Sequence, residues 1–231
     1  MEKSTAFVAP KAVLFDAYGT LFDVYSVGLL AEQLFPGQGQ ALSVLWRDKQ
    51  IEYTRLVSMS HGTHYQPFWA LTQAGLRYAC KKLKLDLSPE AENRLMNQYR
   101  HLSAFPENHG VLQALKERGI VTGILSNGDP EMLGIAVRSA GLDGLLDHVI
   151  SVDSVKRYKT TPEAYALGEQ VTGLKAQHIG FVSCNSWDAL GATWFGYQTL
   201  WVNRYGLPFE ELGTQPHRIG TNLRDVLSLL D

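Results

Sequence analysis

The chain has 231 residues, of which 45% are hydrophobic, and this suits one enzyme-sized unit with a sizeable buried core. A formal net charge of −2, with no run of basic residues, argues against a nucleic-acid partner and favours small-molecule partners. No apolar stretch approaches the roughly 18 to 20 residues of a membrane span, and residues 1–5 lack the apolar core of a signal peptide, so we expect no membrane association and a cytoplasmic address.

The first predicted element is a strand over residues 12–15, an apolar run that ends at Asp16 and turns through Gly19. A carboxylate at the end of such a strand is a candidate nucleophile. Tyr18 stands two residues further on, where an acid could protonate a leaving group and help to hold a metal ion. A phenol does neither near neutral pH, so this element argues against phosphoryl transfer.

Residues 21–105 show helical patterning and no convincing central strand. Leu95, Tyr99 and Leu102 recur at helical spacing, and Ser88 followed by proline is a helix start. We therefore predict a helical cap subdomain over residues 21–105, inserted after the first strand. An insert at this place lies over the carboxyl ends of the strands, where open α/β sheets bind ligands.

From about residue 106, strand-like runs alternate with helical patterns, which is typical of β-α units around a parallel sheet. One helix is predicted to start at Asp129 and end near Gly141, and another to start at Thr161. Both Asp129 and Thr161 precede a proline and are expected to cap the helix with their side chains. The pattern predicts an α/β fold whose doubly wound, mainly parallel, Rossmann-like core sheet is formed by residues 1–20 and 106–231. The further predicted strands cover residues 120–125, 148–152, 178–182 and 198–202.

Polar groups follow the predicted strands in four segments, namely residues 16–20, residues 126–128, Lys159 and residues 183–188. Each segment alone is weak evidence, because aspartate and serine after a strand are common turn and cap formers. Their order and spacing together resemble the haloacid dehalogenase superfamily over nearly the whole chain. Most members of that superfamily are magnesium-dependent phosphatases and mutases that carry paired acids in the first and last of these motifs.

This chain has neither pair of acids, because Tyr18 and Ser183 stand where a second acid would help to bind the metal. With the cap segment over residues 45–54 and with Trp187 beside Asp188, these differences resemble the L-2-haloacid dehalogenase branch. The resemblance implies a hydrolase that needs no metal and no other cofactor. It also implies a homodimer whose ligands are a small 2-haloacid substrate and the released halide ion.

By this resemblance, Asp16 attacks C2 of the substrate, expels the halide with inversion and forms a covalent aspartyl ester. Water assisted by Asp188 then hydrolyses the ester and releases the 2-hydroxy acid. Lys159 can keep Asp16 and Asp188 ionised together, which two close carboxylates in a partly dry site otherwise resist.

The resemblance assigns the remaining site residues to two groups. One group orients or supports the two acids, and its members are Thr20, Tyr165, Ser183 and Asn185. The other group faces the substrate or the halide, and its members are Tyr18, Arg47, Phe68, Ser126, Asn127 and Trp187.

Other interpretations stay open at this point. A magnesium-dependent phosphatase or phosphomutase of the same fold is the main alternative function, and a binding protein without catalysis is another. Arg47 could be a solvated charge on a helix, and Phe68 could be an ordinary core residue. Cys80 and Cys184 are far apart in the sequence, so we expect free thiols and neither a disulfide nor a thiolate zinc site.

Overall fold

The computed structural model describes residues 8–230, and in this range the strands form one six-stranded sheet in the order β3-β2-β1-β4-β5-β6. Every neighbouring pair is parallel. The strands are β1 (Ala12–Phe15), β2 (Val121–Ser126), β3 (His148–Ser151), β4 (Ile179–Ser183), β5 (Gln198–Val202) and β6 (Arg218–Gly220). This arrangement confirms the predicted α/β class with a doubly wound, Rossmann-like core sheet.

The centre of the sheet is apolar on both faces, as a parallel sheet covered by helices requires. All residues of β1, β4 and β5 are buried. Phe15, the last residue of β1, pairs with Ile124 of β2 on one side and with Val182 of β4 on the other. The strand order reverses between β1 and β4, and open α/β sheets bind their ligands outside the carboxyl ends of the strands at such a point.

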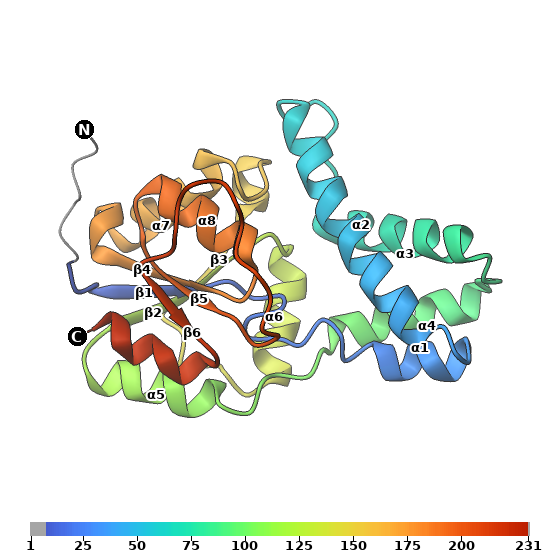
Figure 1. Cartoon of the computed structure of the whole chain (residues 1–231), viewed down its shortest axis with the longest axis horizontal. Coiled ribbons are helices and arrows are strands. Elements are labelled where there is room, and N and C mark those ends of the chain that lie inside the picture. Colours follow the sequence, from blue (N-terminus) through green and yellow to red (C-terminus); the bar gives the residue numbers. More distant parts are fainter. Residues whose placement is uncertain (1–7, 231) are drawn as a thin grey trace.

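Helices cover both faces of the sheet. In Figure 1, α7 (Pro162–Thr172) and α8 (Ser186–Phe195) lie on one face, and α5 (Asn108–Glu117) and the 3-10 helix η3 (Leu223–Leu229) lie on the other. The helix α6 (Pro130–Ser139) packs against β3. Two short 3-10 helices, η1 (Val152–Val155) and η2 (Ala176–His178), follow β3 and precede β4.

Four helices stand beside the sheet and form a separate bundle, which we call the cap (Figure 1). They are α1 (Gly28–Leu34), α2 (Gly39–Met59), α3 (Phe68–Leu83) and α4 (Pro89–Arg100). The chain enters and leaves the cap through adjacent segments, since the N–H of Asp23 donates to the carbonyl of Ser103 at 2.8 Å. The expected helical patterning of this region is confirmed, while the domain boundaries at residues 20 and 106 stay a prediction.

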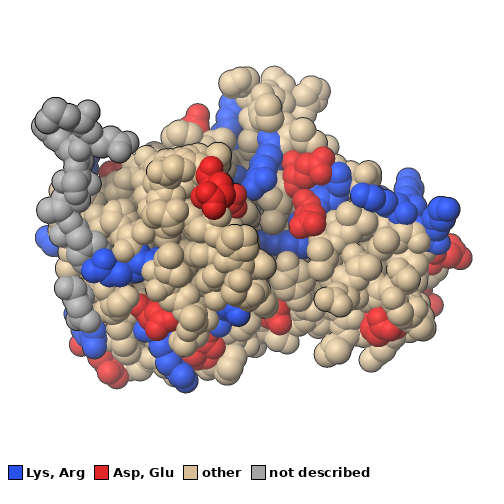
Figure 2. All heavy atoms as spheres, viewed as in Figure 1, with Lys and Arg blue, Asp and Glu red and all other residues tan. Residues whose placement is uncertain are grey.

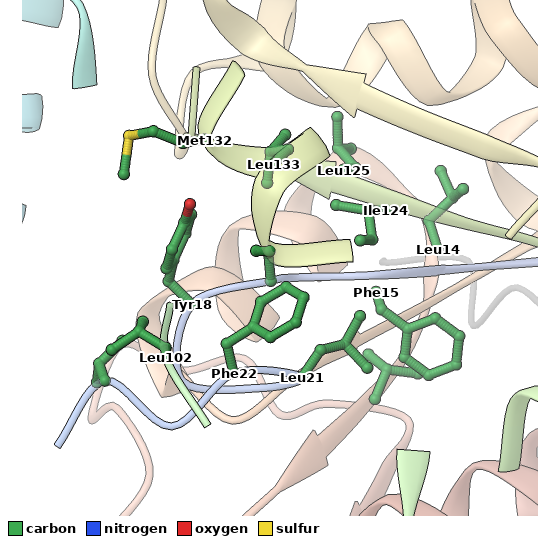
Figure 3. Packing of buried hydrophobic residues seen from close by; sticks show 14 of the residues in the cluster. Leu14, Phe15, Tyr18, Leu21, Phe22, Leu102, Ile124, Leu125, Met132 and Leu133 are labelled. Carbon is green, nitrogen blue, oxygen red and sulfur yellow. The ribbon is translucent and has the colours of Figure 1, made fainter. Parts of the chain in front are cut away.

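The hydrophobic core runs from the sheet into the loop that follows β1. Figure 3 shows Leu14 and Phe15 of β1 beside Ile124 and Leu125 of β2, with Tyr18, Leu21 and Phe22 continuing the cluster. Gly19 in this loop has a φ of 98°. A residue with a side chain rarely adopts this conformation, so glycine at this place lets the chain turn directly after Asp16.

The predicted strands agree with the structure to within one residue at each end, but β6 was not predicted. It has only three residues, and Ile219 at its centre is 59% exposed, so it carries no buried apolar run. The start of α4 is as expected, since the Ser88 hydroxyl accepts a hydrogen bond from the N–H of Ala91. Gly141 follows α6 with a φ of 64°, as a C-terminal cap requires.

The expected side-chain caps at Asp129 and Thr161 are wrong, although both residues stand at the N-cap positions of α6 and α7. Neither side chain bonds to its own helix. The carboxylate of Asp129 instead accepts hydrogen bonds from two N–H groups at the start of α3 in the cap. Those N–H groups have no acceptor within α3, so they bind the Asp129 carboxylate and turn it away from its own helix.

Acidic and basic side chains are interspersed over the face shown in Figure 2, and basic side chains also lie in the crease between sheet and cap. Among the described residues, no helix is both long enough and apolar enough to cross a membrane.

Replacing Gly168 on α7 by alanine is expected to destabilise the fold, although alanine normally favours a helix. A Cβ at this position would overlap the Tyr197 hydroxyl and lie 2.7 Å from Cδ1 of Leu14. We expect Gly168→Ala to lower the free energy of unfolding by about 1 to 3 kcal/mol in urea titrations.

In the control, Gly110→Ala on α5, the added Cβ has no heavy atom within 4 Å, so the free energy of unfolding is expected to rise by about 0.5 to 1 kcal/mol. Equal changes in the two variants would contradict the close packing of α7 on β1.

Candidate active site

The candidate site lies where three adjacent parallel strands end. Asp16 follows β1, Ser126 is the last residue of β2, and Ser183 is the last residue of β4. The N–H of Asp16 still bonds to the carbonyl of Val182 at 2.9 Å, so its backbone is held by the sheet. The Asp16 side chain therefore has a fixed starting point at the reversal of the strand order.

A buried lysine joins the two carboxylates of the site. The Nζ atom of Lys159 lies 3.1 Å from Oδ1 of Asp16 and 2.9 Å from Oδ2 of Asp188. The Lys159 side chain is fully buried, and its backbone N–H donates to Oδ1 of Asn127 at 3.0 Å. Because the ammonium lies between the two acids, it offsets the repulsion that would otherwise protonate one of them.

Asp188 is fully buried, and three donors hold its carboxylate. Tyr165 donates to Oδ1 at 2.7 Å, while Ser183 at 3.2 Å and Lys159 donate to Oδ2. Burial raises the pKa of Asp188 to about 6, and the charge of Lys159 acts against this rise. Burial also raises the pKa of Tyr165 well above its usual range, so this phenol stays a neutral donor.

Asp16 is oriented by neutral donors on the side away from Lys159. Its Oδ2 atom accepts hydrogen bonds from the Thr20 hydroxyl at 3.0 Å and from Nδ2 of Asn185 at 2.9 Å. The Thr20 hydroxyl in turn accepts from the N–H of Cys184 at 2.9 Å, which fixes its rotamer. One carboxylate oxygen thus faces a cation and the other faces two uncharged donors.

Arg47 reaches from α2 of the cap to the loop that carries the nucleophile candidate. Its Nη2 atom donates to the Tyr18 carbonyl at 2.9 Å and to Oδ1 of Asn185 at 3.3 Å, and its Nη1 atom donates to Gln50 at 2.8 Å. The residue is only 8% exposed, and no carboxylate in residues 8–230 forms an ion pair with it. A buried guanidinium whose partners are all neutral favours an anion beside it.

A tight cavity lies between the core and the cap. Its walls combine one carboxylate, one guanidinium, small polar groups and aromatic rings, which suits a small anionic ligand. The lining residues are Asp16, Tyr18, Arg47, Ile51, Thr54, Phe68, Ser126, Asn127 and Trp187.

The structure brings all the predicted site residues together at this place. Those predicted to face the substrate line the cavity, and the others bond to Asp16 or Asp188 behind it. The sequence interpretation missed Ile51 and Thr54, which line the cavity four and seven positions after Arg47. This is helical spacing, so projecting α2 from Arg47 could have found both. The role of each residue stays a prediction.

The residues present do not fit a divalent metal ion. The carboxylates of Asp16 and Asp188 already share the ammonium of Lys159, and Tyr18 and Ser183 add no carboxylate. Magnesium requires near-octahedral oxygen coordination, usually with one or two carboxylates that are free to bind it. Among the described residues, no group of three or more His, Cys, Asp or Glu side chains could hold a metal ion.

Comparison with known proteins agrees with this geometry. The family model of haloacid dehalogenase-like hydrolases matches residues 10–196. The chain belongs to this family. Haloacetate dehalogenase H-2 of Moraxella sp. (strain B) is 46% identical over 206 residues, covering 89% of this chain and 91% of the relative. The (S)-2-haloacid dehalogenase of Pseudomonas sp. (strain YL) is 44% identical and covers 96% of this chain and 94% of the relative.

Solved structures give the same placement. A crystal structure of an L-2-haloacid dehalogenase matches with a TM-score of 0.95 at 57% identity, covering 96% of this chain and 99% of the other. The L-2-haloacid dehalogenase of Xanthobacter autotrophicus with chloropropionic acid covalently bound matches with a TM-score of 0.88 at 33% identity, covering 96% and 98%. Within the family, the chain therefore lies in the L-2-haloacid dehalogenase branch.

Replacing Lys159 by methionine is expected to destabilise the fold in a pH-dependent way. The substitution keeps the buried stem but leaves two close carboxylates without their cation, which costs about 3 to 5 kcal/mol. The folded-state pKa of Asp188 already lies above its unfolded value, and removing Lys159 raises it further. The full decrease in the free energy of unfolding should therefore be seen above that raised pKa. Below it the decrease should be smaller, because the folded state takes up a proton on Asp188.

Urea unfolding at pH 8 and at pH 5 measures this difference. The control is Lys116→Met, which removes a partly exposed lysine paired with Asp147 at 3.4 Å and should change stability by at most about 1 kcal/mol. A loss in Lys159→Met that is equal at both pH values would contradict the charge argument.

Proposed function

We propose that the chain is a hydrolytic dehalogenase that converts short 2-haloalkanoic acids, preferentially the L enantiomers, into 2-hydroxy acids with inversion and without a cofactor. One observation carries the proposal. Asp16 lines a small cavity together with Arg47, and Tyr18 stands where a second acid would help to hold a metal ion. This suits attack by a carboxylate on a saturated carbon next to a leaving anion.

In the proposed first step, an oxygen of Asp16 attacks C2 of the substrate, and the carbon–halogen bond breaks as the carbon–oxygen bond forms. The electron pair of the broken bond leaves with the halide toward Arg47 and Asn127, with the ring of Phe68 beside them. Ser126 anchors the substrate carboxylate. No proton is needed, because a halide is a stable anion, so the phenol of Tyr18 can stand where a general acid would be required for other leaving groups.

In the proposed second step, water attacks the carbonyl carbon of the Asp16 ester and Asp188 accepts one proton from the water. The bond between the carbonyl carbon and the C2 oxygen then breaks, and Asp188 returns this proton to the C2 oxygen, so the 2-hydroxy acid leaves. The second proton of the water is released to the solvent when Asp16 ionises again. The aspartate regained then carries the oxygen of that water. Thr20 and Asn185 orient Asp16, while Ser183 and Tyr165 hold Asp188. Asp188 is buried and is absent from the residues that line the cavity in the described chain, which favours Asp16 over water activated by Asp188 as the group that attacks C2.

The names of the relatives support the substrate class. They include a haloacetate dehalogenase and several (S)-2-haloacid dehalogenases that are 36 to 44% identical to this chain. The inversion, the preference for the L enantiomer and the ester are carried over with that class. A homodimer and a cytoplasmic address stay predictions of the same kind, and gel filtration with light scattering would test the first.

Halide release is the direct test of the function. We expect the purified chain in excess chelator to release chloride from L-2-chloropropionate and from chloroacetate, and to release far less from the D enantiomer. Asp16→Asn should reduce the rate by at least about a thousandfold, since an amide of the same size is a poor nucleophile. Turnover of a phosphate monoester that depends on magnesium, without halide release, would instead favour the phosphatase alternative.

The fate of the water oxygen separates the two possible hydrolytic routes. With enzyme in excess over substrate in heavy-oxygen water, a single turnover through the ester should label Asp16 and leave the hydroxy acid unlabelled. Mass spectrometry of the peptide that contains Asp16 measures this. Label that appears in the hydroxy acid, with an unlabelled peptide, would reject the ester and favour direct attack by water activated by Asp188.

A further inference from the structure

The end of α2 and the segment that joins it to α3 are attached to the core by polar contacts. The Ser58 hydroxyl accepts a hydrogen bond from the N–H of Tyr158 at 3.0 Å, and the Tyr158 hydroxyl donates to the carbonyl of Gln66 at 2.6 Å. Tyr65 donates to Oδ1 of Asp153 at 2.6 Å. Tyr158 directly precedes Lys159, so this attachment lies next to the lysine that joins the two carboxylates.

A further attachment lies at the start of α3. The helix begins after Pro67, which has no side-chain group to cap it. Asp129 of the core supplies the missing acceptors: Oδ1 accepts from the N–H of Phe68 at 2.9 Å, and Oδ2 accepts from the N–H of Trp69 at 2.8 Å. A negative charge at a helix N-terminus is also favoured by the helix dipole. The first turn of a cap helix is therefore completed by a core carboxylate.

The hydrogen bonds from Asp129 to the start of α3 place one wall of the cavity. Phe68 is 2% exposed and lines the cavity, with its ring centroid 5.5 Å from that of Tyr18. On the core side, Asp129 lies in the turn that follows Ser126 and contains Asn127, and both of these residues also line the cavity. The end of β2 and the turn after it thus contribute Ser126 and Asn127 to the cavity lining. The same turn contributes the Asp129 carboxylate, which holds the backbone of Phe68 in the cap.

We propose that Asp129 is a positioning residue for the dehalogenation, because its carboxylate caps α3 from across the core–cap boundary and so holds the Phe68 ring against the substrate. The proposal rests on the proposed function, but the contact itself does not. Asp129 does not line the cavity and acts only through the start of α3. Its removal should therefore change how the cap wall is held without removing any group that reacts.

Backbone hydrogen exchange measures the contact independently of catalysis. In Asp129→Ala, the amides at the start of α3 should exchange about 2- to 30-fold faster, which corresponds to the loss of a helix cap. In Asp129→Asn, which keeps one carbonyl acceptor, the change should be smaller. Unchanged exchange at Phe68 and Trp69 in both variants would overturn the proposal.

The matched control is Asp225→Ala. Asp225 also accepts backbone hydrogen bonds at a helix start, from Thr221 at 2.7 Å and Asn222 at 3.2 Å, but it caps η3, which packs against β5 and β6. We expect this variant to lower the thermal midpoint like Asp129→Ala, to leave exchange in α3 unchanged and to keep the parental rate of halide release. A similar loss of kcat/KM in both variants would mean that reduced stability alone explains the effect of Asp129.

A double-mutant cycle with Phe68→Leu tests whether Asp129 acts through the ring. We expect Asp129→Ala to lower kcat/KM for L-2-chloropropionate about tenfold in the parental chain, because a misplaced wall spoils the geometry of attack. In the Phe68→Leu background, the same change should cost at most about twofold, since contacting residues that act as a unit are not additive. Equal losses in the two backgrounds would overturn the proposal.

The two proposals can fail separately. A parental chain that releases no halide from any 2-haloacid would reject the proposed function, and with it the role of Asp129 in that reaction. The exchange measurement would then still decide whether Asp129 holds the cap. Parental halide release combined with additive losses would keep the dehalogenase and reject only the positioning role.

Discussion

The whole site depends on burying the ammonium of Lys159 between two carboxylates. Three charged groups out of contact with water would be costly unless every remaining lone pair found a donor. Thr20 and Asn185 satisfy Asp16, and Ser183 and Tyr165 satisfy Asp188. These donors come from the ends of two strands and from a helix, so they can meet only where β1 and β4 lie side by side. The buried Lys159 ammonium therefore depends on a strand order that makes β1 and β4 neighbours.

Tyr18 and Ser183 separate this site from that of a metal-dependent enzyme of the same fold, because neither supplies the second carboxylate that would help to bind the metal. A divalent ion between two carboxylates would draw charge from both oxygens and require further oxygen ligands. An ammonium donates one hydrogen bond to each acid and leaves the other oxygen of Asp16 to neutral donors. Across the cavity, Arg47 supplies the second positive charge, so two positive and two negative groups balance before a ligand enters. An anionic substrate and an anionic leaving group can then be accommodated next to Arg47 without a metal to screen them.

The sequence predicted the parts of the site that depend on local structure. Asp16 directly follows the buried strand β1, Lys159 precedes α7, and Asp188 lies in the first turn of α8 after β4, so their spacing along the chain predicts that they meet. The strand β6 escaped because three residues with an exposed Ile219 carry no apolar signal. Asp129 was interpreted wrongly for a different reason. Its position before Pro130 predicts a local cap, but the unpaired N–H groups that attract its carboxylate lie about 60 residues away in the sequence, on α3. Local sequence propensity predicts hydrogen bonds within the same helix, but it cannot predict a partner that the tertiary structure brings from another helix.

The chemistry of the site is divided between two parts of the fold. The core carries the carboxylate that would attack, and the cap carries the guanidinium that would receive the anion, so neither part forms the cavity alone. Arg47 itself bonds to the carbonyl of Tyr18 in the core, and this contact orients the guanidinium while it joins the two parts. Hydrogen bonds that close the cap on the core therefore set the distance between nucleophile and anion site. Because the rate of a reaction depends on how precisely the reacting groups are positioned, we expect the hydrogen bonds that hold the cap on the core to affect catalysis as well as stability.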